Sequence, residues 1–340
     1  MIHCQVRTDL ALEVKEGLAR AGEKMHGIRV EEYDRKSEEL HITKVYIETQ
    51  NAAGIMGKPI GTYVTMEADT LCEPDEGYHR EISTCLAEEL SELIRQLRQQ
   101  GEETRRQGGE TRRQGEETRR QGEETRRQGE ATRQQEMMNA SYLVVGLGNR
   151  EVIADALGPR VLDNLLVTRH MVKLYGKAAL EDETGSIVSC LEPGVMAKTG
   201  METAEIIEGV VEKTKPDLVI VIDALAARST KRLNRTIQLT NTGIQPGSGV
   251  GNHRNALSME NLHVPVIAIG IPTVVDAATI VRDAIGKLSR GDESFAGADF
   301  SELNNMYMTG KDVDEIIKRV SYTVSEGINI AMKQMPEAQS

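Results

Sequence analysis

The sequence contains few aromatic residues, with no Trp and two Phe among its 340 residues. Hydrophobic residues make up 39% of the chain, so a large core is expected, but aliphatic side chains must build it. No apolar run reaches the ~18 residues of a membrane-spanning helix, and residues 1–10 lack the apolar segment of a signal peptide. These absences predict a cytoplasmic protein that has no membrane partner.

Positive charge is also scarce. The 41 Lys and Arg residues are outnumbered by 53 Asp and Glu residues, which leaves a formal net charge of −12. An acidic chain has no general electrostatic attraction to nucleic acids, so we expect no direct nucleic-acid partner. A basic protein would be a better electrostatic match.

Cysteine pairs and the common catalytic motifs are missing. The four cysteines, at positions 4, 72, 85 and 190, form no CxxC pair, so we expect reduced thiols rather than a disulfide framework or a zinc site. No sequence feature marks a base beside Cys190, which argues against a nucleophilic role for it. No GxSxG, HExxH or GxxxxGKS/T motif occurs. The sequence therefore predicts neither a metal nor another cofactor.

Residues 101–136 repeat a seven-residue unit close to GEETRRQ and contain nine Glu and nine Arg. The unit has no apolar position for a coiled-coil seam, and its glycine weakens the solvated helix that the Glu–Arg spacing would support. We interpret the repeat as an insertion at the surface that is disordered or forms a frayed helix. Its equal numbers of Glu and Arg argue against RNA binding by the arginines.

The second half of the sequence alternates between strand-like and helix-like segments. Its expected strands cover residues 142–147, 186–191, 218–222, 236–240 and 264–271, and its expected helices cover 154–167, 202–213, 274–288 and 312–332. In the first half, a helix over 9–21 precedes strands over 42–49 and 61–67 and a long helix over 75–99. The pattern predicts an α/β fold with a mostly parallel sheet covered by helices.

Polar residues just past the expected strand ends are candidates for an active site, because ligands of open parallel sheets bind at that edge. Asp223 directly follows the apolar run LVIVI, and Asp155 lies shortly after the strand that ends in GLGN. Either aspartate could instead be a helix N-cap, where Asp is favoured. By position alone, Asn149, Arg228 and Asn241 are further candidates, as contacts to a substrate or an oxyanion.

Two carboxyl groups in one cleft would differ in protonation, since neighbouring like charges cannot both form cheaply. The ionised member can activate water while the protonated member polarises a carbonyl, which suits peptide hydrolysis. A nucleotide site is disfavoured, because Glu151 stands where the GxGxxG pattern needs its third glycine and would repel a pyrophosphate.

Six segments carry a resemblance to a known family. They are VRTDLALE (6–13), GLGNREVIADALGPRV (146–161), LLVTRH (165–170), DALAARS (223–229), TIQLTNTGIQPGSGVGN (236–252) and PVIAIGIPTVVDA (265–277). In this order they resemble the spore germination proteases, the endopeptidases that degrade small acid-soluble spore proteins. That family is similar to the hydrogenase maturation proteases, which implies a shared α/β fold. The resemblance implies that Asp155 and Asp223 are the catalytic pair of an endopeptidase of an atypical aspartic type.

The resemblance also implies a zymogen that processes itself. Residues 1–9 would be a propeptide, cut between Asp9 and Leu10, and residues 10–340 would form a single peptidase domain. The family further implies a homotetramer that acts on small acid-soluble spore proteins in the forespore and spore core. The repeat over 101–136 has no counterpart in the family pattern.

Two other functions stay open. One is a metal-assisted processing protease of the hydrogenase maturation type, in which comparable carboxylates and a His contact the metal. No motif in this sequence supplies that His. The other is a non-catalytic peptide-binding module on the same fold.

Deletion of residues 101–135 should leave fold and activity largely intact, because a surface segment of this kind adds no apolar contacts. Soluble yield, thermal unfolding and cleavage rate of the shortened protein would be compared with those of the full chain. Loss of soluble protein on deletion would contradict the interpretation as an insertion.

Overall fold

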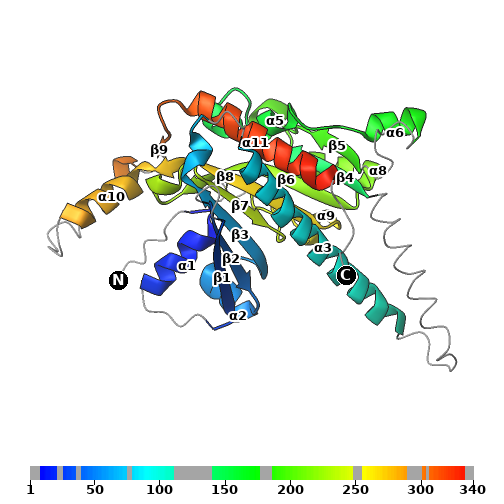
Figure 1. The fold of residues 1–340 in the computed structure, drawn as a ribbon, viewed down its shortest axis with the longest axis horizontal. Coiled ribbons are helices and arrows are strands. Elements are labelled where there is room, and N and C mark those ends of the chain that lie inside the picture. The colour runs from blue at the N-terminus through cyan, green and yellow to red at the C-terminus, as the bar shows by residue number, and fades with distance from the viewer. Residues whose placement is uncertain are drawn as a thin grey trace.

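A computed structural model describes residues 8–20, 26–35, 40–74, 79–110, 140–176, 186–247, 255–288, 301–303 and 306–333 (Figure 1). The strands are β1 (Ile28–Arg35), β2 (Leu40–Ile47), β3 (Gly61–Ala68), β4 (Ser141–Gly146), β5 (Ile187–Leu191), β6 (Leu218–Ala227), β7 (Thr236–Thr240), β8 (Val266–Asp276) and β9 (Tyr307–Met308). The α-helices are α1 (Ala11–Arg20), α2 (Gln50–Met56), α3 (Arg80–Glu110), α5 (Leu157–Leu162), α6 (Arg169–Tyr175), α7 (Met196–Thr199), α8 (Thr203–Thr214), α9 (Met259–Leu262), α10 (Ala277–Leu288) and α11 (Val313–Lys333). Short 3-10 turns are η1 (Asp69–Cys72), η2 (Ile153–Asp155), η4 (Thr230–Arg232) and η7 (Ser301–Leu303).

The described strands form one mixed sheet in the order β1-β2-β3-β7-β8-β6-β4-β5, with β9 added beside β8. The neighbours β5, β4, β6 and β8 are parallel, as predicted for the second half. The ladders among β1, β2, β3, β7 and β8, and the ladder of β9 with β8, are antiparallel. The prediction of an α/β fold is confirmed, but the prediction of a mostly parallel sheet is wrong.

The direction of β7 explains this error. The link from β6 to β7 covers residues 228–235, which is shorter than the dozen residues that a parallel crossover needs. The chain therefore turns back, and β7 runs antiparallel between β8 and β3. Through β7 the antiparallel strands of the first half join the parallel strands of the second half in one sheet. The first of these strands, β1, is largely exposed and highly charged, so it lacks the alternation by which the other strands were predicted.

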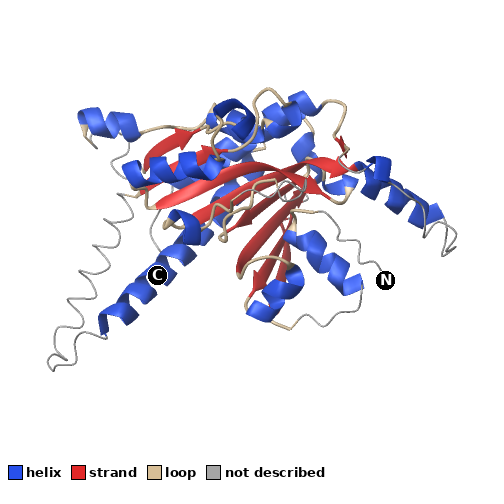
Figure 2. Ribbon diagram, turned by 180° about the vertical axis from the view of Figure 1, so that it is seen from behind, coloured by secondary structure: helices blue, strands red, loops and turns tan. Residues whose placement is uncertain are grey.

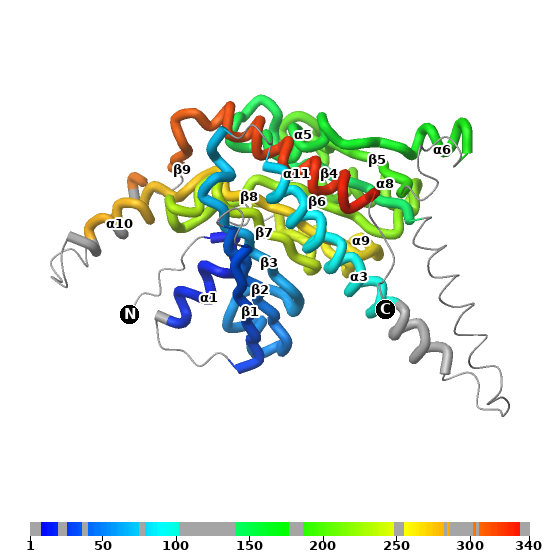
Figure 3. Tube along the Cα trace, in the orientation of Figure 1, coloured from blue at the N-terminus to red at the C-terminus, as the bar shows by residue number. Residues whose placement is uncertain are grey.

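Helices cover both faces of the sheet (Figure 2). On one face, α3, α5 and α11 pack over the main aliphatic core, and the predicted apolar stripe of α3 lies within it. The opposite face is covered by α8 and α9 over the parallel strands and by α1 and α2 over β2 and β3. Figure 3 shows α1, α2 and β1–β3 grouped together on one side of the molecule. The sheet is thus buried on both faces by aliphatic side chains, as the scarcity of aromatic residues requires.

Two predicted helices have different limits in the structure. The helix expected over 154–167 is reduced to η2 and the short α5. The long helix expected to end at residue 99 continues to Glu110, so the first part of the repeat is helical. The rest of the repeat lies outside the described residues, so its predicted disorder stays a prediction.

Glycine allows β4 and α5 to approach each other closely. A Cβ atom on Gly146 would lie 2.5 Å from the carbonyl oxygen of Gly158, and one on Gly158 would lie 2.4 Å from the carbonyl oxygen of Leu147. Both distances are below van der Waals contact, and both involve backbone atoms that cannot rotate away. The GLGN turn after β4 is therefore fixed against the start of α5 by backbone contact.

Substitution Gly158→Ala should lower the free energy of unfolding by about 1–3 kcal/mol, because the added methyl group forces α5 away from β4. Urea unfolding would measure this loss, and the dependence of the free energy of unfolding on urea concentration should stay unchanged. Gly209→Ala is the matched control, since Gly209 lies within α8 and has no atom within 4 Å of an added Cβ. We expect that control to stabilise by about 0.5–1 kcal/mol. Equal effects of the two substitutions would contradict the close contact.

Candidate active site

The loop from Gly148 to Asp155 is closed by hydrogen bonds from one backbone donor. The Asn149 N–H donates to the Asp155 carbonyl oxygen at 3.0 Å and to the Asp155 carboxylate Oδ2 at 2.9 Å. Gly148 has a φ of +110°, and a Cβ there would lie 2.0 Å from the Asp155 carbonyl oxygen. The second glycine of GLGN therefore allows the loop to fold back and to hold the Asp155 carboxylate.

Two further hydrogen bonds attach this loop to the sheet. The Leu147 N–H donates to the Ile222 carbonyl of β6 at 2.8 Å, and the Thr273 hydroxyl of β8 donates to the Ala154 carbonyl at 2.6 Å. Ile222 directly precedes Asp223, and Ala154 directly precedes Asp155. The bonds therefore bring the Asp155 loop to the part of β6 that carries Asp223.

Asp223 lies within β6 and not at its end, because β6 continues to Ala227 alongside β8. The neighbour on the other side, β4, ends its pairing at Gly146 and Ile222, so Asp223 is the first residue of β6 beyond that ladder. The Asp223 side chain is only 7% exposed, and its Oδ1 accepts the Ala224 N–H at 2.9 Å. As predicted, Asp223 follows the end of a strand pairing, that of β4 with β6. It does not lie at the end of β6 itself.

Neither aspartate caps a helix. Asp223 is followed by more strand, and the residue that precedes α5 is Ala156, which makes no side-chain cap bond. The two carboxyl groups have different surroundings, since Asp223 is buried in the sheet and Asp155 lies in a partly exposed loop. Such an asymmetric pair can divide the roles of proton acceptor and proton donor in hydrolysis.

The N-terminal segment pairs with the last residues of β6. The Asp9 N–H donates to the Ala226 carbonyl at 3.0 Å, and the Ala226 N–H donates to the Asp9 carboxylate Oδ2 at 2.9 Å. Leu10 is 0% exposed and packs with Leu225, Ala227 and Val275. The predicted cleavage site, the Asp9–Leu10 bond, therefore lies on the sheet a short distance along β6 from Asp223.

The carbonyl oxygen of Asp9 accepts hydrogen bonds from two side chains. Lys58, just after α2, donates from Nζ at 2.8 Å, and Gln238 of β7 donates from Nε2 at 3.2 Å. Burial lowers the pKa of the Lys58 ammonium, and the nearby Asp9 carboxylate opposes that shift. The Gln238 Oε1 also accepts the Ala11 N–H at 2.7 Å. The two donors and the acceptor hold the peptide on both sides of the Asp9–Leu10 bond.

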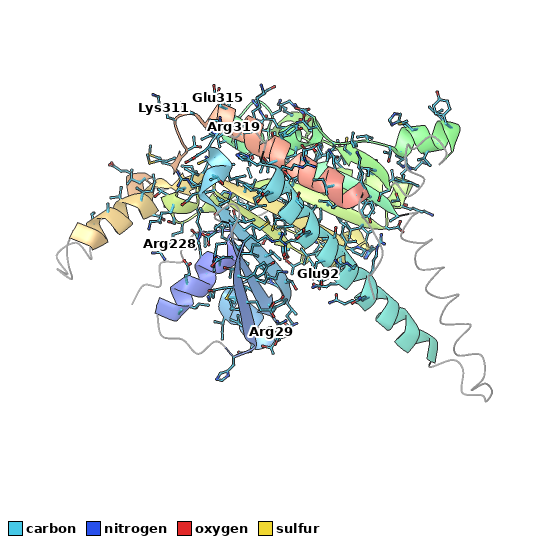
Figure 4. All side chains as sticks on the ribbon, viewed as in Figure 1. Arg29, Glu92, Arg228, Lys311, Glu315 and Arg319 are labelled. Atoms are coloured by element: carbon cyan, nitrogen blue, oxygen red, sulfur yellow. The ribbon has the colours of Figure 1, made fainter. Side chains whose placement is uncertain are left out.

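Glu13 anchors the N-terminal segment a few residues after the Asp9–Leu10 bond. Its carboxylate accepts the backbone N–H groups of Arg228 at 2.7 Å and Ser229 at 3.0 Å, just past the end of β6 beside α1 (Figure 4). The largely buried Arg232 lies 3.6 Å from Glu13 and forms a 2.7 Å ion pair with Glu16. These contacts fix α1 on the face of the sheet that carries Asp223.

Sequence reasoning missed Lys58, Gln238 and Thr273. One signal was available for Gln238, because the buried strand TIQLT places polar residues at alternate positions, which marks a polar stripe on one face. Thr273 does follow the expected strand over 264–271, which is a strand-end signal, whereas Lys58 carries no comparable signal because it acts through a contact with a segment far away in the sequence.

The three further candidates have different positions. Asn149 is part of the Asp155 loop, and its Oδ1 accepts the Glu151 N–H at 3.1 Å. Arg228 lies at the end of β6 over α1. Asn241 accepts the Thr62 N–H at 2.9 Å and joins β7 to β3. Because β7 is antiparallel, its carboxyl end points toward the amino ends of β6 and β8, so the structure does not bring Asn241 next to Asp223, and its role as a substrate contact stays a prediction.

Among the described residues, no group of three or more His, Cys, Asp or Glu side chains is placed to hold a metal ion. Burial raises the pKa of the Cys190 thiol, which disfavours the thiolate that a nucleophile requires.

Comparisons with known proteins identify the family of this chain. A family model described as germination protease matches residues 7–107 and 112–291. The germination protease of Caldanaerobacter subterraneus subsp. tengcongensis is 40% identical over 351 residues, 96% of this chain and 94% of that protein. This chain belongs to the germination protease family. The germination protease of Clostridium perfringens is 38% identical over 352 residues, 96% of this chain and 95% of that protein. The germination protease of Bacillus cytotoxicus is 42% identical over 281 residues, 82% of this chain and 66% of that protein.

Membership of the family makes the chain a protease, a hydrolase of peptide bonds that serves germination. The family match continues through residues 112–136, so the repeat is not confirmed as an insertion without a family counterpart. The likeness to hydrogenase maturation proteases stays a prediction. In the described ranges, no helix has the length and apolar character to cross a membrane.

Substitution Thr273→Val should reduce the rate of peptide cleavage several-fold, because it removes the hydroxyl that holds the Asp155 loop on β8. It should also lower the free energy of unfolding by about 1–3 kcal/mol, since the Ala154 carbonyl loses its donor. Thr214→Val is the matched control, because the Thr214 hydroxyl makes a similar 2.7 Å bond to the Val210 carbonyl within α8. A protease assay in which both variants lose activity equally would count against a positioning role for Thr273.

Proposed function

We propose that this protein is the endopeptidase that begins the degradation of small acid-soluble spore proteins during germination. Asp155 and Asp223 activate the attacking water and supply a proton to the leaving amine. The protein is made as a zymogen that cuts itself between Asp9 and Leu10. Its site of action is the forespore and spore core, and its assembly is a homotetramer.

The observation that carries this proposal is the attachment of the Asp155 loop to β6 and β8. Hydrogen bonds from Leu147 and Thr273 hold the loop at the segment of β6 that contains Asp223. A peptide segment of this chain already pairs with Ala226 of β6, three residues beyond Asp223. A carboxyl pair next to a bound peptide is the arrangement that hydrolysis without a covalent intermediate requires.

The surroundings of the two carboxyl groups support a division of labour between them. Asp155 is partly exposed, so water can reach it, and its Oδ2 is oriented by the Asn149 N–H. Asp223 is buried, where the charged form is disfavoured unless it is compensated. We assign Asp155 the role of proton acceptor from water and Asp223 the role of proton donor to the leaving amine.

Substitutions Asp155→Asn and Asp223→Asn should each reduce cleavage of a purified small acid-soluble spore protein by on the order of 10²–10⁴-fold, because either change removes a proton-transfer group. Cleavage would be followed by electrophoresis and mass spectrometry, and folding by thermal unfolding. Asp34→Asn is the matched control, because Asp34 is exposed and pairs with His41 on β1 and β2, the first two strands of the sheet order and away from β6.

The same experiment tests the rival functions. Variants of Asp155 and Asp223 that fold, bind and cleave normally would overturn the assignment of the pair. Binding without cleavage by the unaltered protein would indicate a peptide-binding module. Activity that is abolished by a chelator and restored by one metal would indicate a metal-assisted processing protease.

A further inference from the structure

We infer that Lys58 and Gln238 are the donors that polarise the Asp9 carbonyl and stabilise the oxyanion formed when the chain cuts its own Asp9–Leu10 bond. This inference rests on the proposed function and adds two catalytic residues to it. Both side chains donate to the one carbonyl oxygen, at 2.8 Å from Lys58 and 3.2 Å from Gln238. Two converging donors on a single carbonyl are the geometry of an oxyanion hole.

The position of Gln238 in the sheet relates this carbonyl to Asp223. Gln238 of β7 pairs with Gly270 of β8, and Gly270 pairs with Asp223 of β6. Residues paired in this way point to the same face, so Gln238 and Asp223 both face the N-terminal segment. Two strand spacings separate them, or about 10 Å between Cα atoms.

Gly270, the residue between them, contributes no side chain. A Cβ on Gly270 would lie 2.5 Å from Leu225, which packs against the buried Leu10. The Asp9–Leu10 peptide therefore lies over β8, with its carbonyl held from the β3 and β7 side and its flanking residues held by β6. This leaves the side toward Asp223 as the direction from which an activated water attacks.

The hydrogen bonds from Lys58 and Gln238 go to the peptide oxygen of Asp9 and not to its carboxylate. The Asp9 carboxylate is occupied by the Ala226 N–H, while Lys58 donates to the backbone oxygen. An anchoring lysine would gain more from an ion pair with the carboxylate than from a bond to a neutral carbonyl. The Gln238 Oε1 also accepts the Ala11 N–H, which holds the chain on the C-terminal side of the Asp9–Leu10 bond.

The reaction step is balanced with one water molecule. The water oxygen forms a bond to the Asp9 carbonyl carbon, and one water proton passes to the carboxylate pair. The carbonyl π electrons move to the oxygen, where the Lys58 ammonium and the Gln238 amide donate to the developing charge. Collapse breaks the C–N bond, and the Leu10 nitrogen leaves with a proton returned by the carboxyl pair.

The test uses the full chain and follows the loss of residues 1–9 by intact mass. Lys58→Met should slow self-cleavage by on the order of 10²-fold or more, the usual effect of removing one oxyanion donor. Lys58→Arg should restore much of the rate, because the guanidinium keeps a charged donor. Gln238→Glu should also slow cleavage, because it keeps the acceptor for Ala11 but loses the donor to the Asp9 oxygen. Lys15→Met, which removes a lysine of α1 paired with Glu32, should process at the normal rate.

The pH dependence of the self-cleavage rate distinguishes a catalytic role of Lys58 from a role in anchoring the peptide. With Lys58 as the charged donor, the rate should fall as pH rises through its lowered pKa, and Lys58→Arg should remove that fall because guanidinium stays protonated. Unchanged rates in Lys58→Met, or superimposable pH profiles of the unaltered protein and Lys58→Arg, would overturn the inference. If Lys58→Met processes normally while Asp223→Asn does not, only the inference fails. If Asp223→Asn processes normally, the proposed function fails instead.

Discussion

The end of β4 and the first turn of α5 are in direct backbone contact, because neither Gly146 nor Gly158 carries a side chain. This contact decides the course of the chain after β4. The loop between the two glycines has no room to extend, so it folds back through Gly148 and closes on the Asp155 backbone. The position of one carboxyl group of the candidate site is therefore set by the packing of two glycines.

Much of the fold was predictable from the sequence for identifiable reasons. The strands β4, β6 and β8 are apolar runs that the sheet buries on both faces, and α3 and α11 show apolar positions at helical spacing. The parallel direction of β4, β5, β6 and β8 follows from their alternation with helices. The Asp155 and Asp223 candidates followed from strand ends in the same half of the chain, and the structure places the loop of one beside the strand of the other.

The features that were not predictable depend on long-range pairing. The antiparallel direction of β7 follows from a short link and from its fit between β3 and β8, and neither partner is visible in the local pattern. The same holds for Lys58, whose contact with Asp9 joins segments 49 residues apart. Local patterns report burial and element type, whereas these residues gain their roles from which segments become neighbours.

The complete burial of Leu10 has a consequence for the energetics of processing. In the intact chain the Leu10 nitrogen belongs to a neutral amide that donates to the Thr8 hydroxyl, while the Leu10 side chain lies within an aliphatic cluster. Hydrolysis would convert the nitrogen into an ammonium and separate it from Thr8, and an unpaired charge beside apolar side chains is costly. The cut chain could not keep the packing of the uncut chain, so its new terminus would have to move toward water. Religation would then require the reverse desolvation, which makes the step effectively one-way.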